Sequence, residues 1–182
     1  MNKNRQSQVP YGFVFLFFAV VFSASLVLAA ERVEKADTDK DGKPDEWKYY
    51  QGDQLDRVER DGDHDGKPEI KLWMKKGKPD RSEVDRNGDG KSDLTRFMED
   101  GKPVREQGDL NFDGKLDVWS YYKGTDKDLM IVDKNHDGRP DAWFYYGPRS
   151  LKVIGGKMDE NFDGKIDKSF GAFPEEEKRQ PW

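Results

Sequence analysis

Oxygen-bearing side chains recur at fixed spacing in a nine-residue string, first seen as DTDKDGKPD at residues 37–45. Every copy has a carboxylate or amide at positions 1, 3, 5 and 9, glycine at position 6, and lysine or arginine at position 7. Successive starts are 24 residues apart except for the last interval, which is 26. Six copies in one phase predict a repeat protein. The copies start at Asp37, Asp61, Asp85, Asp109, Asp133 and Asp159.

This pattern suits a hard divalent cation, because Ca²⁺ takes about six to eight oxygen ligands. On a curling loop, side chains at positions 1, 3 and 5 turn inward, and glycine at position 6 permits the positive φ of the sharp turn. Position 9 then closes the shell as a bidentate carboxylate. Position 7 provides only its backbone carbonyl, so its cationic side chain is free to point outward. We expect about one Ca²⁺ per repeat, up to six in all.

The predicted metal ligands are therefore positions 1, 3, 5, 7 and 9 of each copy. The alternative is that the strings are only turns, since Asp and Gly favour turns for conformational reasons. Turn formation alone does not account for oxygen-bearing side chains at four fixed positions of every copy. The predicted ligands are Asp37, Asp39, Asp41, Lys43, Asp45, Asp61, Asp63, Asp65, Lys67, Glu69, Asp85, Asn87, Asp89, Lys91, Asp93, Asp109, Asn111, Asp113, Lys115, Asp117, Asp133, Asn135, Asp137, Arg139, Asp141, Asp159, Asn161, Asp163, Lys165 and Asp167.

The string resembles the EF-hand-like calcium loops written DxDxDGxxD, found in thrombospondin type 3 repeats and in integrin-type propeller repeats, including those of bacterial exported proteins. The resemblance covers nine residues of each repeat and implies calcium as the metal. A helix-loop-helix EF-hand has a bidentate Glu at position 12, whereas no copy has an acidic residue there. The cysteines of thrombospondin repeats are also missing, and 24 residues are too few for a four-stranded propeller blade. The expected form is a calcium loop between strands.

Positions 10 to 14 are short runs rich in aromatic and branched residues, such as EWKYY and VWSYY, which predict strands. A glycine follows and a more polar run precedes the next string, so each repeat reads as loop, strand, turn and return strand. Pro79 and Pro103 in the return runs are tolerated only at a sheet edge or a strand start. The predicted fold is all-β: tandem 24-residue β-hairpin repeats with a calcium loop in each, the sixth copy being a C-terminal cap. Position 13 is aromatic in the first five copies, which predicts a ladder on one face: Tyr49, Trp73, Phe97, Tyr121 and Tyr145.

Residues 1–29 have the pattern of a secretory signal peptide, with Lys3 and Arg5 before an apolar run at 12–28 and small residues at its end. An uncleaved membrane anchor is the alternative, because the run is near the lower length limit for a spanning helix. In both cases we expect the chain to be exported, to the periplasm, the cell surface or the medium. If the signal is cleaved, we expect no membrane contact. Residues 30–36 are expected to be a linker, 37–173 the six-copy array, and 174–182 a polar C-terminal tail.

Composition limits the remaining possibilities. Hydrophobic residues are only 34% and charged residues 38%, and the chain has no cysteine, so bound metal is the expected staple of the fold. A net charge of −5 gives no support for nucleic-acid binding. His64 and His136, both at position 4 of a string, are interpreted as exposed and incidental. With no cysteine, nucleophile motif or phosphate loop, we do not expect an enzyme.

The predicted function is calcium binding that makes a structural or interaction module at the cell envelope rigid. The partners expected are calcium ions and an envelope protein or glycan. One alternative uses the aromatic ladder: runs such as Trp47-Lys48-Tyr49-Tyr50 resemble choline- and glycan-binding repeats of bacterial surface proteins, in which exposed rings bind sugars or quaternary amines. The rings can equally form the core of a thin sheet. A second alternative is soluble calcium buffering.

Overall fold

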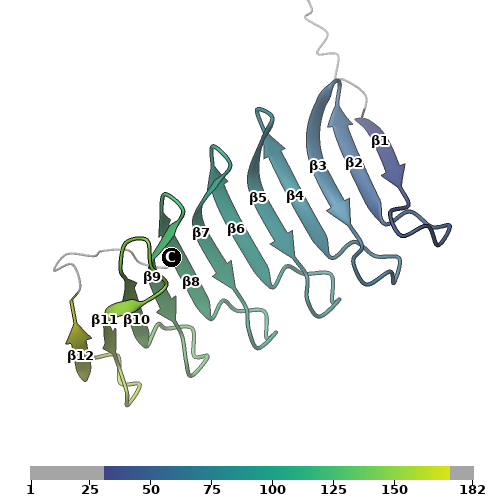
Figure 1. Ribbon diagram of the computed structural model, residues 1–182. Helices are drawn as coiled ribbons and strands as arrows, with labels where there is room; N and C mark the ends of the chain where they lie inside the picture. The colour runs from purple at the N-terminus through teal and green to yellow at the C-terminus, as the bar shows by residue number, and fades with distance from the viewer. Residues whose placement is uncertain (1–30, 173–182) are drawn as a thin grey trace, which may run out of the picture.

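The computed structural model describes residues 31–172, so the predicted signal peptide and C-terminal tail lie outside the described residues. Within this range the chain forms one antiparallel sheet of twelve strands that follow one another in sequence order (Figure 1). This confirms the predicted all-β class and the succession of hairpins. The strands are β1 (Glu31–Ala36), β2 (Glu46–Gln51), β3 (Gln54–Arg60), β4 (Ile70–Lys75), β5 (Lys78–Val84), β6 (Leu94–Glu99), β7 (Lys102–Gly108), β8 (Val118–Lys123), β9 (Asp126–Val132), β10 (Ala142–Tyr146), β11 (Val153–Met158) and β12 (Lys168–Gly171).

Two kinds of connection alternate along the sheet. Each acidic string occupies the whole connection between an odd-numbered strand and the next, and these connections lie along one edge (Figure 1). Glycine-containing turns join the other strand pairs along the opposite edge. The longer last interval of the sequence comes from a longer turn between Tyr146 and Val153. We name the strings loop 1 (37–45), loop 2 (61–69), loop 3 (85–93), loop 4 (109–117), loop 5 (133–141) and loop 6 (159–167).

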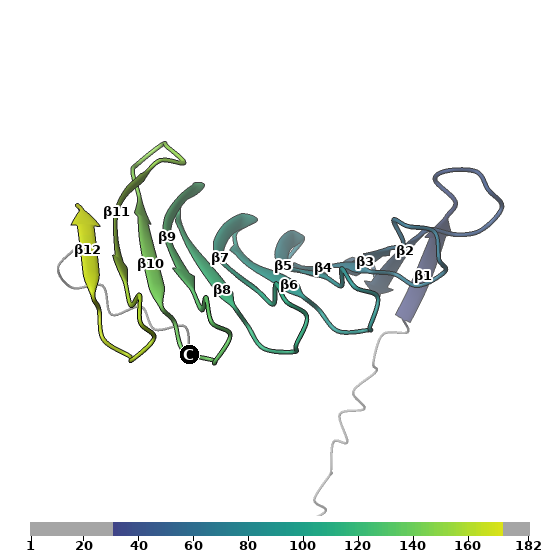
Figure 2. The same cartoon turned by 90° about the horizontal axis from the view of Figure 1, so that it is seen from below.

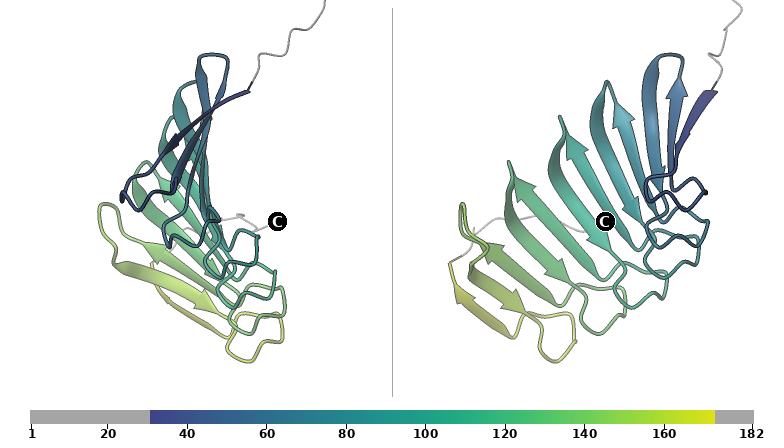
Figure 3. Two further views of the ribbon diagram at one scale, coloured as in Figure 1. Left: turned by 90° about the vertical axis from the view of Figure 1, so that its right-hand side faces the viewer. Right: turned by 45° about the vertical axis from the view of Figure 1, so that its right-hand side comes forward.

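The described residues form a single twisted and curved layer, with no helix or second sheet against either face (Figures 2 and 3). Every hairpin joined by a glycine turn contains a register shift; in the first, Tyr49 pairs with Arg57 but Tyr50 pairs with Leu55. Such β-bulges increase the local right-handed twist. Pro79 is the second residue of β5 and pairs just beyond such a shift, so it lies at a strand start as expected.

The position-13 aromatic side chains share one face, as predicted, but they do not stack directly on one another. Between the first four rings, each pair of neighbours is separated by an arginine of the return strand. We call this set the arginine–aromatic row: Tyr49, Arg57, Trp73, Arg81, Phe97, Arg105 and Tyr121. The guanidinium carbon of Arg57 lies 3.5 Å from the ring centre of Tyr49 and 5.5 Å from that of Trp73. Arg81, from the strand on the other side of β4, lies 5.1 Å from the same ring centre of Trp73. Cation–π attraction therefore replaces ring–ring stacking here.

The hydrophobic core is small and lies in the C-terminal half of the same face. On β9, Leu129 takes the register position that arginine has in the earlier return strands, and Ile131 takes the position of Glu59 in β3; both are fully buried. Leu129 pairs with Tyr121 and Tyr145 on the neighbouring strands. Among the described residues, only these hydrophobic side chains are buried: Trp119, Leu129, Ile131, Ala142 and Tyr145.

The two outermost strands are exposed along their whole length. β12 has only four residues, which fits a terminal unit with no further neighbour. Residues 31–36, expected to be part of a linker, instead form β1 and pair with β2 from Glu31 opposite Gln51 to Ala36 opposite Glu46. This polar strand has no hydrophobic alternation that identifies it. It forms because loop 1 returns the chain antiparallel beside β2.

Candidate metal centres

All six loops share one hydrogen-bond pattern. The glycine N–H at position 6 donates to the position-1 carboxylate at 2.6 to 2.9 Å. The position-5 N–H donates to the position-3 side chain at 3.0 to 3.1 Å, and the position-7 N–H donates to position 5 at 2.8 to 2.9 Å. The position-2 N–H donates to the position-9 carboxylate at 2.6 to 2.9 Å. The oxygen atoms at positions 1, 3, 5 and 9 are thus drawn towards the backbone of their own loop.

Backbone conformation explains why the loops curl this way. Glycine at position 6 has φ between 87° and 97° in all six loops, a region that residues with a Cβ seldom adopt. Position 4 is also left-handed, with φ from 61° to 72°. Two left-handed residues close together turn the chain sharply, so side chains on either side of them converge. The position-7 residues Lys43, Lys67, Lys91, Lys115, Arg139 and Lys165 are exposed and donate their N–H within the loop.

The loops are tied to the sheet and to one another. In loop 1 the N–H of Asp45 donates to the carbonyl of Ala36 at 2.9 Å, which closes the loop at its base. The N–H of Asp61 then donates to the carbonyl of Asp45 at 2.9 Å, and the equivalent bond joins every neighbouring pair of loops at 2.8 to 2.9 Å. Positions 1 and 9 of adjacent loops therefore lie side by side at the base of the loop edge.

Two sets of predicted ligands come close enough to hold a metal ion. The carboxylate oxygens of Asp37, Asp39 and Asp41 in loop 1 lie within 4.8 Å of one another, as do those of loop 2 residues Asp61, Asp63 and Glu69. Loops 3 to 6 have Asn at position 3, so the equivalent set there contains an amide oxygen and one fewer carboxylate. The residues fit a hard cation, since every side chain in these two sets offers oxygen.

Several carboxylate oxygens at positions 1 and 9 of the loops are buried without a hydrogen-bond partner. Asp61 is 3% exposed and Asp133 is 1% exposed, and the Oδ1 atom of each has no hydrogen-bond partner. Glu69 Oε2 is likewise buried without a partner. Leaving a buried carboxylate oxygen unpaired costs free energy, more than for a neutral group. A cation bound within loops 2 and 5 would satisfy these atoms.

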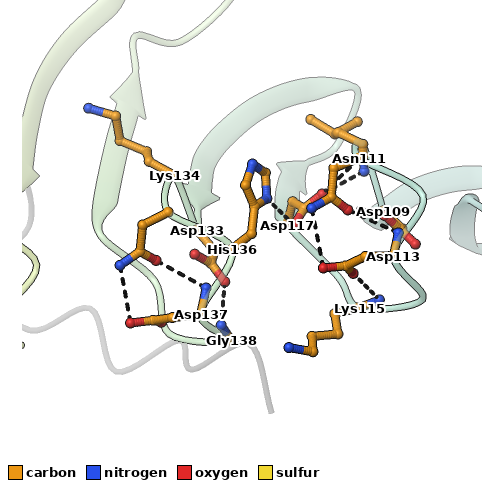
Figure 4. Close-up of polar contacts among 12 residues, drawn as sticks. Asp109, Asn111, Asp113, Lys115, Asp117, Asp133, Lys134, His136, Asp137 and Gly138 are labelled. Carbon is orange, nitrogen blue, oxygen red and sulfur yellow. Dashed lines mark hydrogen bonds and ion pairs between the residues drawn. The ribbon is translucent and has the colours of Figure 1, made fainter.

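Both histidines are exposed, as interpreted from the sequence, but they are not incidental, and this part of the interpretation is corrected. Each position-4 histidine reaches the preceding loop: His136 Nδ1 donates to Asp117 Oδ1 at 2.7 Å, and His64 Nδ1 lies 3.3 Å from Asp39 Oδ2 (Figure 4 shows the first contact). The ligand atoms of Asp39, Asp45 and His64 also lie within 4.8 Å of one another. The signal for this contact was present in the constant 24-residue period, which places corresponding residues of adjacent loops side by side.

The histidine contact also shifts the pKa of both partners. The hydrogen bond to Asp117 raises the pKa of His136 above its ordinary value. Burial acts to raise the pKa of Asp117, but the hydrogen bonds from His136 and from the N–H groups of Leu110 and Asn111 outweigh it, so this pKa is lowered. Asp117 therefore stays ionised, as a metal ligand must be.

Comparison with known proteins adds no family to this picture. No protein-family model matches the chain, and no curated protein is similar to it in sequence. Among residues 31–172 there is no helix long and apolar enough to cross a membrane. The functional conclusion therefore depends on the loops themselves.

Proposed function

We propose that this chain is an exported calcium-binding repeat protein in which calcium makes a structural or interaction module rigid at the cell envelope. The observation that supports this most strongly is loop 2. Its carboxylate oxygens from Asp61, Asp63 and Glu69 gather within 4.8 Å, and Asp61 Oδ1 and Glu69 Oε2 are buried without a partner. A bound divalent cation provides both the missing contacts and the opposing charge.

Calcium is the metal that suits the donors best. The side-chain donors are carboxylate and amide oxygens, and the chain has no cysteine. Calcium prefers oxygen ligands and accepts a variable coordination number. The resemblance to EF-hand-like loops of the DxDxDGxxD type supports the same choice. The six loops carry 20 carboxylates among their ligand positions, which repel one another without metal. We expect dissociation constants of about 0.1 to 1 mM, as in extracellular calcium modules.

A structural role follows from the position of the loops. Each loop joins two adjacent strands of a one-layer sheet that has few buried hydrophobic residues. Calcium in a loop holds both strand ends in place and neutralises the acidic edge. The signal-like sequence of the N-terminal segment supports a location outside the cytoplasm, where free calcium is high enough to fill weak sites.

Calorimetric titration of calcium into the protein without its signal segment tests the proposal. We expect about one site per loop, and fewer than three sites would refute it. The double variant Asp61→Asn/Glu69→Gln should remove one site, because it takes charge from loop 2 while keeping side-chain size. Asp53→Asn, the same chemical change in an exposed turn at the opposite edge, is the matched control and should leave the stoichiometry unchanged.

Glycan or choline binding by the aromatic side chains is less favoured. In the arginine–aromatic row, Arg57 and Arg81, from the strands on either side of β4, lie over the Trp73 ring at 5.5 and 5.1 Å from its centre. Arg57 also lies over Tyr49 at 3.5 Å. These are the ring surfaces on which a sugar or quaternary amine would stack. Tryptophan fluorescence separates the two roles: ligand-binding rings are quenched by acrylamide and shift with added ligand, whereas structural rings respond mainly to calcium.

A further inference from the structure

The residue at position 4 determines what lies between neighbouring loops. In loops 2 and 5 it is histidine, and each histidine contacts a predicted ligand of the preceding loop: Asp39 at 3.3 Å and Asp117 at 2.7 Å. In loop 3 it is Gly88, which has open space around it. A groove of about 830 Å³ separates loop 2 from loop 3 at this point, lined in part by Glu69 and Gly88. Adjacent loops are thus bridged by a side chain in some places and separated in others.

The bridge from loop 5 ends on a residue that its neighbour needs. Asp117 Oδ2 accepts hydrogen bonds from the N–H groups of Leu110 and Asn111 in loop 4, at 2.7 and 3.1 Å, while Oδ1 accepts the bond from His136 (Figure 4). Asp117 is 1% exposed, so water does not substitute easily for either partner. The orientation of this carboxylate is therefore set by two loops together.

In both loops with a histidine at position 4, one carboxylate oxygen of the position-1 aspartate also lacks a hydrogen-bond partner. In loops 1, 3 and 4 the position-4 N–H donates to Oδ1 of the position-1 Asp at 2.7 to 2.8 Å. In loops 2 and 5 the corresponding oxygens, Asp61 Oδ1 and Asp133 Oδ1, are buried and have no partner. A metal ion is the natural partner for these two atoms. Its arrival there would also fix the turn that carries the histidine.

We propose that calcium binds in coupled pairs: loop 5 with loop 4 through His136, and loop 2 with loop 1 through His64, while Gly88 leaves loop 3 uncoupled from loop 2. This inference rests on the proposed calcium function. Filling loop 5 holds the His136 turn in place, and His136 in turn orients Asp117 for calcium in loop 4. His136 and His64 are positioning residues in this scheme. Coupling in binding is reciprocal, so filling loop 4 favours loop 5 equally.

Glycine amide signals allow each loop to be followed separately. The N–H of Gly114 donates to Asp109 in loop 4, and the N–H of Gly138 donates to Asp133 in loop 5, both at 2.7 Å. In protein labelled with ¹⁵N-glycine, each signal reports calcium binding in its own loop. Asp133→Asn weakens loop 5, and we expect the calcium affinity of loop 4 to fall by about fivefold or more as a result.

A double-mutant cycle isolates the contribution of His136 to the coupling between loops 4 and 5. In a His136→Phe background, Asp133→Asn should no longer change the calcium affinity of loop 4. Phenylalanine is a safe replacement because Phe112 and Phe162 occupy the same position with nearly the same φ, 63° and 62° against 61° for His136. An equal effect of Asp133→Asn with and without His136 would overturn the proposal, as would no effect in either background.

Loops 2 and 3 provide the matched control, because the backbone bond between adjacent loops is present there too, from the N–H of Asp85 to the carbonyl of Glu69 at 2.8 Å. Asp85→Asn in loop 3 should leave calcium binding by loop 2 unchanged, as followed through Gly66. Gly88→His should introduce coupling. A loop 2 response to Asp85→Asn in the presence of Gly88 would show that the backbone, and not histidine, carries the effect. If no glycine signal responds to calcium in the unmodified protein, the proposed function itself is wrong.

Discussion

Removing calcium from all six loops is expected to unfold the sheet, whereas weakening a single loop should leave it folded, because each site contributes only part of the total. The described residues form one layer whose buried hydrophobic side chains number five, so little else holds distant strands together. Position-1 and position-9 carboxylates, such as Asp133 and Asp117, are 1% exposed and would be left near one another without a counter-charge. Metal binding and folding should therefore be coupled, as in other small domains held together by metal.

The size of the effect follows from mass action. With dissociation constants of about 0.1 to 1 mM and about 10 mM calcium, each site stabilises the folded state by about 1.4 to 2.7 kcal/mol. Six such sites contribute about 8 to 16 kcal/mol, which is comparable to the whole stability of a typical domain, about 5 to 15 kcal/mol. For a chain of this length, the melting temperature should fall by about 20 °C or more on chelation.

Circular dichroism melts and amide hydrogen exchange, each in calcium and in EDTA, measure this directly. Sodium chloride at the ionic strength of the calcium sample serves as the control, because it screens the acidic edge without binding the loops. We expect loss of strand signal and of amide protection in both the EDTA and the sodium samples. Unchanged melting temperature and protection after full chelation would refute the reasoning.

Three further predictions concern individual residues. Leu129→Ala, at a fully buried position, should lower the free energy of unfolding by about 2 to 5 kcal/mol in urea titrations. Leu151→Ala, at a side chain that is 83% exposed, should lower it by less than about 0.5 kcal/mol. Equal losses of stability would mean that Leu129 does not belong to the core. Gly114→Ala places a Cβ on a residue with φ 87°, which costs about 1 to 2 kcal/mol and should weaken calcium binding in loop 4. Lys115→Ala should change the calcium affinity of loop 4 by no more than about twofold. A larger effect of Lys115→Ala would mean that the lysine side chain, and not only its backbone carbonyl, takes part. Hydrogen bonds from Arg60 and then Lys48 hold the pKa of Glu46 below its ordinary value of 4.5, so ionised Glu46 stabilises the protein above that pH and the contribution is lost as pH falls through the lowered pKa. The difference in unfolding free energy between wild type and Glu46→Gln should therefore narrow on acidification, and a difference independent of pH would contradict the assignment.

Much of the fold could be predicted from the sequence, because the interactions that produce it are local. Positions 1, 3, 5 and 9 of each string, with glycine at position 6, lie within nine residues, so their convergence needs only a local turn. The aromatic and branched runs at positions 10 to 14 predicted the first strand of each hairpin for the same reason. The all-β class and the succession of hairpins follow from these short-range patterns.

Contacts between repeats could be predicted less well. The aromatic ladder placed its rings on the right face, but strand pairing inserted Arg57 and Arg81 between them. β1 was missed because its polar residues become a strand only by pairing with β2. The core was not located either, since Leu129 is buried only once β9 pairs with β8 and β10, which places Tyr121 and Tyr145 on either side of it.

The sequence by itself determined which atoms are available for a metal and how each loop turns, because ligand types, glycine and spacing act within one short segment. Only the tertiary structure decided how the loops relate to one another. It placed His136 against Asp117 and left Gly88 beside an open groove, although all three belong to strings that look nearly alike. The reason is physical: a hydrogen bond between loops depends on the register of the sheet that carries them, and that register is set by strand pairing along the whole array.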